Sequence, residues 1–124
     1  MKALIILAHG SKINQCLKSI EFHKRRIEKL EVFDEVKIAF LEFKPKLHEV
    51  VKKCKSETIY IIPFFLLYGV HTIENIPKLV EMVKSKYKEK KIVLCKPIGT
   101  DPLITFAILN RVIEEIKDEE GYKD

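Results

Sequence analysis

The chain contains no tryptophan and only three cysteines among its 124 residues. Cys16, Cys54 and Cys95 lie far apart and form no CxxC pair. This scatter excludes a four-cysteine iron–sulfur cluster within one chain, and disulfides are not expected in a cytosolic protein. We expect Cys16 and Cys95 to behave as small apolar residues of the core.

A long hydrophobic run is also missing. The longest one, at positions 59–70, is broken by Pro63 and Gly69 and is too short to span a bilayer. Met1 and Lys2 lead directly into an ordinary apolar segment, without the small-residue cleavage site of a secretory signal. We therefore expect a cytoplasmic protein that does not contact a membrane.

Basic residues outnumber acidic ones, with 23 Lys and Arg against 18 Asp and Glu and a net charge of +5. The simplest interpretation is solvated helix faces, and the alternative is a field that attracts an anionic partner. Because no basic and aromatic stripe is present, we expect no nucleic acid, whereas a small polycarboxylate stays open as a partner. The sequence also lacks GxxxxGK[ST], GxGxxG and GxSxG, so it offers neither a known phosphate-binding loop nor a nucleophile elbow.

Apolar segments alternate with amphipathic ones along the chain. Apolar runs predict strands at positions 3–8, 36–41, 58–62 and 91–95. Helical spacing predicts helices at about 14–30, 46–53 and 74–87, the last with Pro77 in its first turn, and a final helix with Leu103, Phe106, Asn110, Ile113 and Ile116 on one face. This alternation predicts an α/β fold, a four-stranded parallel sheet with helices on both faces in a flavodoxin-like three-layer αβα arrangement. We expect a single domain over 1–124, with a frayed tail at 119–124.

Polar side chains follow three of the predicted strands. His9 comes after the first strand, Glu42 after the second and His71 beyond the third, and Glu74 lies one helical turn after His71. The carboxyl ends of parallel strands meet at one edge of the sheet, so these groups are expected to converge there. Two imidazoles and a carboxylate suit a divalent first-row metal. A lone histidine at a strand end is more often an ordinary polar cap, whereas two at one rim make both interpretations about equal, as they are for Glu42. The apolar loop before His71, which contains Phe64, Phe65 and Tyr68, is either core or the wall of a site for a flat hydrophobic ligand.

Four segments together resemble the short, single-domain sirohydrochlorin cobaltochelatases, the small archaeal type of the CbiX family of class II chelatases. They are AHGSK at 8–12, AFLEF at 39–43, IIPFFLLYGVHTIENIP at 61–77 and KPIGTDP at 96–102. The resemblance extends in order over nearly the whole chain. It implies a chelatase fold and a homodimer in which two subunits form the equivalent of a longer, two-domain enzyme.

The resemblance also implies roles for individual residues. His9 and His71 would bind the metal as catalytic residues, with His9 as the proton acceptor, and Glu42 and Glu74 are further candidates for metal binding or proton relay. The candidates for substrate binding are Leu66, Leu67, Tyr68, Gly69, Val70, His71 and Lys44. Lys44 stands where relatives often carry an acidic or polar residue, and Asp101 stands where many carry a histidine.

The activity implied is insertion of Co²⁺ into sirohydrochlorin in anaerobic cobalamin biosynthesis, with the metal as substrate and no permanently bound cofactor. Nickel or ferrous iron is the alternative metal, because imidazole and carboxylate ligands do not distinguish these ions. A carrier that binds a metal or tetrapyrrole without inserting one is the non-enzymatic alternative.

Overall fold

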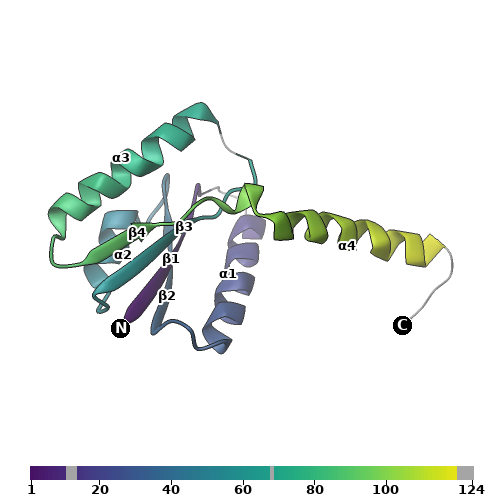
Figure 1. Cartoon of the computed structure of the whole chain (residues 1–124), viewed down its shortest axis with the longest axis horizontal. Helices are drawn as coiled ribbons and strands as arrows, with labels where there is room; N and C mark the ends of the chain where they lie inside the picture. The colour runs from purple at the N-terminus through teal and green to yellow at the C-terminus, as the bar shows by residue number, and fades with distance from the viewer. Residues whose placement is uncertain (11–13, 68, 120–124) are drawn as a thin grey trace.

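A computed structural model describes residues 1–10, 14–67 and 69–119, with the side chains of 14–16 and 70–73 left undescribed. Strands and helices alternate along the chain (Figure 1). They are β1 (Lys2–Ala8), α1 (Asn14–Lys29), β2 (Glu35–Phe40), α2 (Leu47–Lys53), β3 (Thr58–Pro63), α3 (Val70–Lys86), β4 (Lys91–Leu94), a 3₁₀ turn η1 (Ile98–Thr100) and α4 (Pro102–Glu119). Over the described residues, no helix is both long and apolar enough to cross a membrane.

The four strands form one parallel sheet in the order β2-β1-β3-β4. The chain leaves β1 toward β2 and then returns to the other side of β1 to form β3. The switch point of the sheet therefore lies between the carboxyl ends of β1 and β3, where open α/β sheets bind their ligands. This arrangement confirms the predicted α/β fold, and β2 lies at the sheet edge, as its partly alternating pattern predicts.

The sheet face under α2 and α3 is completely packed. Ile5 of β1 and Ile59 and Ile61 of β3 are inaccessible to solvent there. Val51 of α2 and Val80 of α3 pack against them and are almost as deeply buried. Because both faces of these strands are apolar, β1 and β3 fit the centre of a parallel sheet and no other position.

Of the helices that the structure describes, α1 covers the opposite face. Ile20 of α1 is buried against Leu4 and Ile6 of β1 and Val36 of β2. Leu17 and the post-helix Leu30 share the predicted helical spacing with Ile20, yet both are exposed. Leu30 lies beyond the end of α1 at Lys29, and α1 packs on the sheet through Ile20 and Ile27.

Two expectations about the helices are wrong. The third helix begins at Val70 rather than near 74, so Pro77 lies well inside α3 and leaves one carbonyl of the preceding turn without its N–H donor. The final helix α4 does not cover the sheet, and Figure 1 shows it projecting away from the other elements. No residue of α4 is buried, so the apolar face predicted from Leu103 to Ile116 is exposed. Spacing predicts that a helix forms, but it does not say against which surface the helix packs.

Candidate active site at the carboxyl ends of the strands

The side chains of His9 and Glu42 meet at the carboxyl rim of the sheet. Pairing between β1 and β2 continues past the strand ends, where the backbone N–H groups of Leu41 and Glu42 donate to the carbonyls of Ala8 and His9 at 2.9 and 3.0 Å. His9 and Glu42 are thereby held side by side, and the imidazole Nε2 lies 4.0 Å from the Glu42 carboxylate Oε1. The predicted convergence of these two residues is confirmed.

Gly10 turns the chain away from the sheet directly after His9. Its φ is +90°, a conformation that L-residues with a side chain rarely adopt. A Cβ at Gly10 would also lie 2.7 Å from Cδ2 of Phe43 and 3.3 Å from Cβ of Phe40. His9 is therefore followed by a turn that only glycine can make, because a side chain at position 10 would clash with Phe43 and Phe40.

The imidazole has a different contact on each side. Nδ1 of His9 lies 3.4 Å from the Gly10 carbonyl oxygen, and the tautomer that donates this hydrogen bond carries its proton on Nδ1. Its Nε2 then presents a lone pair on the side of Glu42. Two acceptors about 4 Å apart can be joined by one cation, because ligand bonds of about 2.0–2.2 Å to nitrogen and oxygen span that gap.

The His9 and Glu42 pair is open to solvent on one side and walled by an aromatic ring on the other. Their side chains are 58% and 61% exposed. The buried Phe65 presents a ring whose centroid lies 6.5 Å from that of His9, edge to face. A ligand can thus reach the pair directly from solvent, and the aromatic wall restricts how the imidazole turns.

The other predicted ligands stand on α3. The backbone of His71 lies in the first turn of that helix, but its side chain lies outside the described part of the structure, so its approach to His9 stays a prediction. Glu74 follows in the same helix and is exposed. Among the side chains that the structure describes, no group of three or more His, Cys, Asp or Glu residues is placed to hold a metal.

The loop between β3 and α3 presents apolar side chains to solvent at this rim. Leu66 and Leu67 are 61% and 91% exposed, and Gly69 precedes the first turn of α3. Tyr68 and the side chain of Val70 lie outside the described residues. The described part of this loop therefore offers an uncovered apolar surface close to Phe65, the ring that contacts His9.

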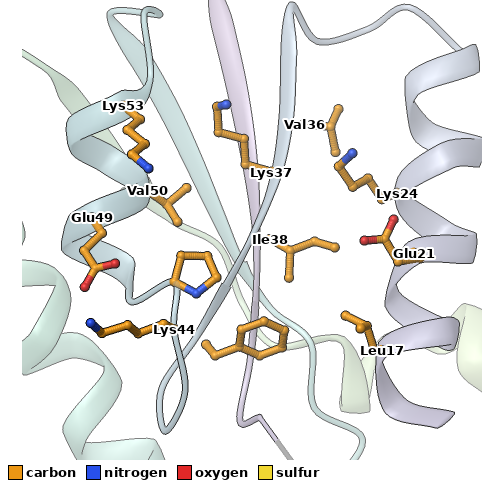
Figure 2. Close-up of a pocket in the computed structure, with 12 residues that line it drawn as sticks. Leu17, Glu21, Lys24, Val36, Lys37, Ile38, Lys44, Glu49, Val50 and Lys53 are labelled. Atoms are coloured by element: carbon orange, nitrogen blue, oxygen red, sulfur yellow. The ribbon is translucent and has the colours of Figure 1, made fainter. Parts of the chain in front are cut away.

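Lys44 lies apart from this rim surface. It lines a groove of about 540 Å³ beside the edge strand β2 (Figure 2). Three further lysines, Lys24, Lys37 and Lys53, line the same groove, whose apolar floor comes from β2, and neither His9 nor Glu42 contributes to it. Direct binding of the same ligand by Lys44 and the His9–Glu42 pair therefore has no support in this arrangement.

Asp101 has a structural partner. Its carboxylate accepts a hydrogen bond of 2.9 Å from the backbone N–H of Leu103, and Pro102 follows at the first position of α4. This is the side-chain cap expected of an aspartate at a helix start. Sequence reasoning missed this role, although the Asp-Pro pair before an apolar run is its usual signal.

The chain is similar to known proteins in both sequence and fold. Residues 3–115 match the sequence profile of the CbiX family. The chain is 31% identical to a sirohydrochlorin cobaltochelatase of Sulfurisphaera tokodaii over 94% of this chain and 96% of that protein, and 27% identical to one of Methanopyrus kandleri over 96% and 100%. A crystal structure described as a putative cobalamin biosynthesis CbiX protein of Marinobacter aquaeolei superimposes with a TM-score of 0.78 at 28% identity, over 95% of this chain and 99% of that one.

Proposed function

The chain belongs to the CbiX family, and from this premise we propose that it is a sirohydrochlorin cobaltochelatase, which inserts Co²⁺ into sirohydrochlorin in anaerobic cobalamin biosynthesis. The observation that carries the proposal is the pairing of His9 with Glu42 at the carboxyl ends of β1 and β2, next to the switch point between β1 and β3. A base and an anionic ligand side by side are what metal insertion into a protonated macrocycle requires.

Metal insertion removes N–H protons from the ring as the metal enters it. A neutral imidazole accepts protons near physiological pH, and Nε2 of His9 is the nitrogen directed away from the backbone. Glu42 supplies negative charge that attracts the incoming cation and stabilises the imidazolium formed after proton transfer. His9 therefore acts as proton acceptor and metal ligand in this proposal, with Glu42 as its charged partner.

The exposure of the pair suits an ion that must be passed on. A cation held between two largely exposed side chains keeps much of its hydration, and attraction between unit charges at 4 Å in water is only about 1 kcal/mol. We assign His71 as the second imidazole ligand and Glu74 as a further carboxylate candidate. Such a weak, open site releases its metal to the macrocycle more readily than a closed structural site would.

The macrocycle is flat, with an apolar face and carboxylates around its edge. The exposed side chains of Leu66 and Leu67 supply a surface for the flat face. The net charge of +5 attracts the carboxylates. We propose that the loop from Leu66 to His71 contacts the ring and that no cofactor is permanently bound.

A single sheet leaves the rim open on one side. We propose that two copies of the chain assemble with their rims facing, so that the tetrapyrrole is enclosed between them, and that the reaction takes place in the cytoplasm. Cobalt is our choice of metal because the two cited curated relatives are named cobaltochelatases. The donor atoms at the rim accept nickel and ferrous iron as well.

The test is anaerobic metallation followed by absorbance. Purified protein, sirohydrochlorin and Co²⁺, Ni²⁺ or Fe²⁺ are mixed, and each rate is compared with the rate without protein. The proposal expects the largest acceleration with Co²⁺. A spectral shift on binding without faster metallation would instead identify a carrier, and a larger acceleration with Ni²⁺ or Fe²⁺ would reassign the metal.

A further inference from the structure

The helix α4 carries an apolar stripe that is not buried against any other described part of its own chain. Its 18 residues form a rod of about 27 Å, none of them buried. The stripe repeats at helical spacing on one side of α4 and consists of Phe106, Ile108, Leu109, Val112, Ile113 and Ile116, each between 45% and 65% exposed. A stripe of this length and character is typical of a helix that packs against a sheet.

Among the described elements, no helix covers one half of one face of the sheet. On the α1 side, Tyr60 and Ile62 of β3 pack at the margin of the cluster under α1 and stay partly buried, as do Val93 of β4 and the following Cys95. We call these four residues the β3–β4 face. Their neighbour Ile61, which points to the opposite face, is inaccessible to solvent. One helix about 10 Å wide covers roughly two strands spaced 4.8 Å apart, and α1 already covers β1 and β2.

The junction between β4 and α4 directs the helix away from this face. Asp101 donates its N–H to the carbonyl of Ile98, accepts from Leu103 through its side chain and accepts from Ile104 through its carbonyl. Gly99 packs so closely that a Cβ there would lie 2.5 Å from the Leu66 carbonyl oxygen. Folding α4 back onto its own sheet would disturb these contacts.

We propose that α4 packs on the β3–β4 face of a second copy of this chain, and that the α4 of the second copy packs on the same face of the first. The chain has an exposed apolar helix and a partly exposed apolar sheet face. In two copies related by a two-fold axis, each helix can cover the sheet face of the other copy. The inference rests on the homodimer proposed above and specifies how it forms. Because α4 starts beside the 65–67 loop, the exchange holds the two rims near the two-fold axis.

The polar side of α4 argues against a membrane as the partner. Its charged residues are Arg111, Glu114, Glu115, Lys117, Asp118 and Glu119. Four acidic groups against two basic ones repel the anionic surface that interfacial amphipathic helices usually bind through lysine and arginine. A second copy of the chain, with its matching apolar face, is the better partner.

The first test compares two substitutions on α4 that add the same charge. Leu109→Asp places a carboxylate on the stripe, and Ala107→Asp places one on the opposite side of the helix, which also carries Arg111 and Glu114. Because a dimer contains each site twice, Leu109→Asp should weaken dimerisation about 100-fold or more in sedimentation, and Ala107→Asp should leave it unchanged.

Cysteine alkylation mapped by mass spectrometry reports where α4 packs. Cys95 should react at least about tenfold faster in Leu109→Asp than in the wild type or Ala107→Asp, because the β3–β4 face is then uncovered. Cys54 is buried elsewhere and should stay unreactive in all three proteins, which shows that the core is folded.

Mixing two variants distinguishes exchange of α4 between subunits from packing of α4 on its own sheet. Leu109→Asp protein is mixed with an excess of Cys95→Ser protein, whose α4 is intact, so that any reactive Cys95 belongs to the first. The proposal expects the second protein to protect this cysteine. Protection of Cys95 in a wild-type monomer at every dilution would show that α4 folds back on its own sheet and would overturn the exchange.

Two other outcomes would also overturn it. One is a dimer in which Cys95 reacts equally in wild type and Leu109→Asp, which places the interface elsewhere but leaves the proposed homodimer standing. The other is binding of the monomer to phosphatidylserine vesicles through the apolar stripe. Metallation assays on the same proteins report separately on the proposed chemistry.

Discussion

The Glu42 carboxylate stands beside the His9 imidazole because the backbone of one residue is bonded to the backbone of the other. The N–H of Glu42 donates to the carbonyl of His9 at 3.0 Å, and the two side chains then approach to 4.0 Å. The position of the pair is thus set by the β1–β2 ladder. Substitution of either side chain should change the chemistry of the rim with little effect on the fold.

His9→Ala removes the proposed base. We expect metallation of sirohydrochlorin to slow by about 10²–10⁴-fold, the usual contribution of general acid–base catalysis. Because the side chain is largely exposed, the free energy of unfolding should change by only about 0.5 kcal/mol or less. The matched control is His48→Ala on α2, since His48 also stands 4.0 Å from a glutamate, Glu49, but on a different element. Equal activity of the two variants would remove His9 from the mechanism.

Glu42→Gln removes a charge and keeps the shape of the side chain. The metal then loses one anionic neighbour, and at about 1 kcal/mol for unit charges at 4 Å in water we expect the KM for Co²⁺ to rise about five- to tenfold. Steady-state assays over a range of cobalt concentrations measure this, with Glu49→Gln as the control. If Glu42→Gln altered neither KM nor kcat, the carboxylate would be an ordinary surface group.

Gly10→Ala tests the turn that positions the rim. The φ of +90° and the 2.7 Å approach to Phe43 should together cost about 1–2 kcal/mol of unfolding free energy, measured by urea denaturation. Gly69→Ala is the comparison, because Gly69 has a φ of −82° and open space around a Cβ. A larger loss in Gly69→Ala than in Gly10→Ala would contradict the role assigned to the turn.

Sequence patterns predicted the sheet well and the surroundings of the site only in part. β1 and β3 are apolar on both faces, and such strands fit only the interior of a parallel sheet. Because β1 and β2 are parallel, His9 and Glu42, which follow them, lie at the same edge. The close packing of Gly10 against Phe43 and of Gly99 against Leu66 left no mark in the sequence beyond the glycines themselves. Contacts of this kind depend on how loops meet in space.

The destination of α4 could not be predicted either. Its apolar spacing is the same whether the helix covers its own sheet or that of a second copy. The direction is set by local hydrogen bonds at Asp101 and by the approach of Gly99 to Leu66. The start of α3 was predicted too late because proline is most common in the first turn of a helix. In the structure, Pro77 lies inside α3, which begins at Val70.

Glu35→Gln should make the protein less stable, with an effect that depends on pH. Burial alone would raise the pKa of the Glu35 carboxyl, but hydrogen bonds from the Ser56 hydroxyl and the N–H groups of Lys55 and Ser56, with the charge of Lys37, outweigh it and lower that pKa below its ordinary 4.5. The ionised carboxylate therefore stabilises the fold above pH 4.5, and this contribution is lost as the pH falls through the folded pKa.

We expect the variant to lose about 1–3 kcal/mol at pH 7, and the difference from wild type should shrink below pH 4.5. Urea denaturation at several pH values measures both quantities. Glu57→Gln is the control, since Glu57 is exposed and pairs only with the amino terminus among the described contacts. A difference that stayed constant down to pH 3 would show that the charge of Glu35 is not what stabilises the fold.

Asp101→Asn and Asp101→Ala separate a helix cap from a substrate ligand. Asparagine preserves the capping oxygen, so Asp101→Asn should match the wild type in stability and metallation. Alanine should cost about 1 kcal/mol and speed amide exchange at Leu103. Loss of metallation in Asp101→Asn with the helix intact would instead assign the carboxylate to the substrate.

Gly99 lies between α4, the proposed dimer contact, and the 65–67 loop beside the proposed base His9. The backbone before α4 rests on the carbonyls of Phe65 and Leu66, and the ring of Phe65 stands against His9. A displacement of α4 would therefore reach the imidazole in two steps, through the backbone of Phe65 and Leu66 and then through the Phe65 ring. In the proposed dimer, the element that binds the partner is thus also the one that supports the wall beside the proposed base.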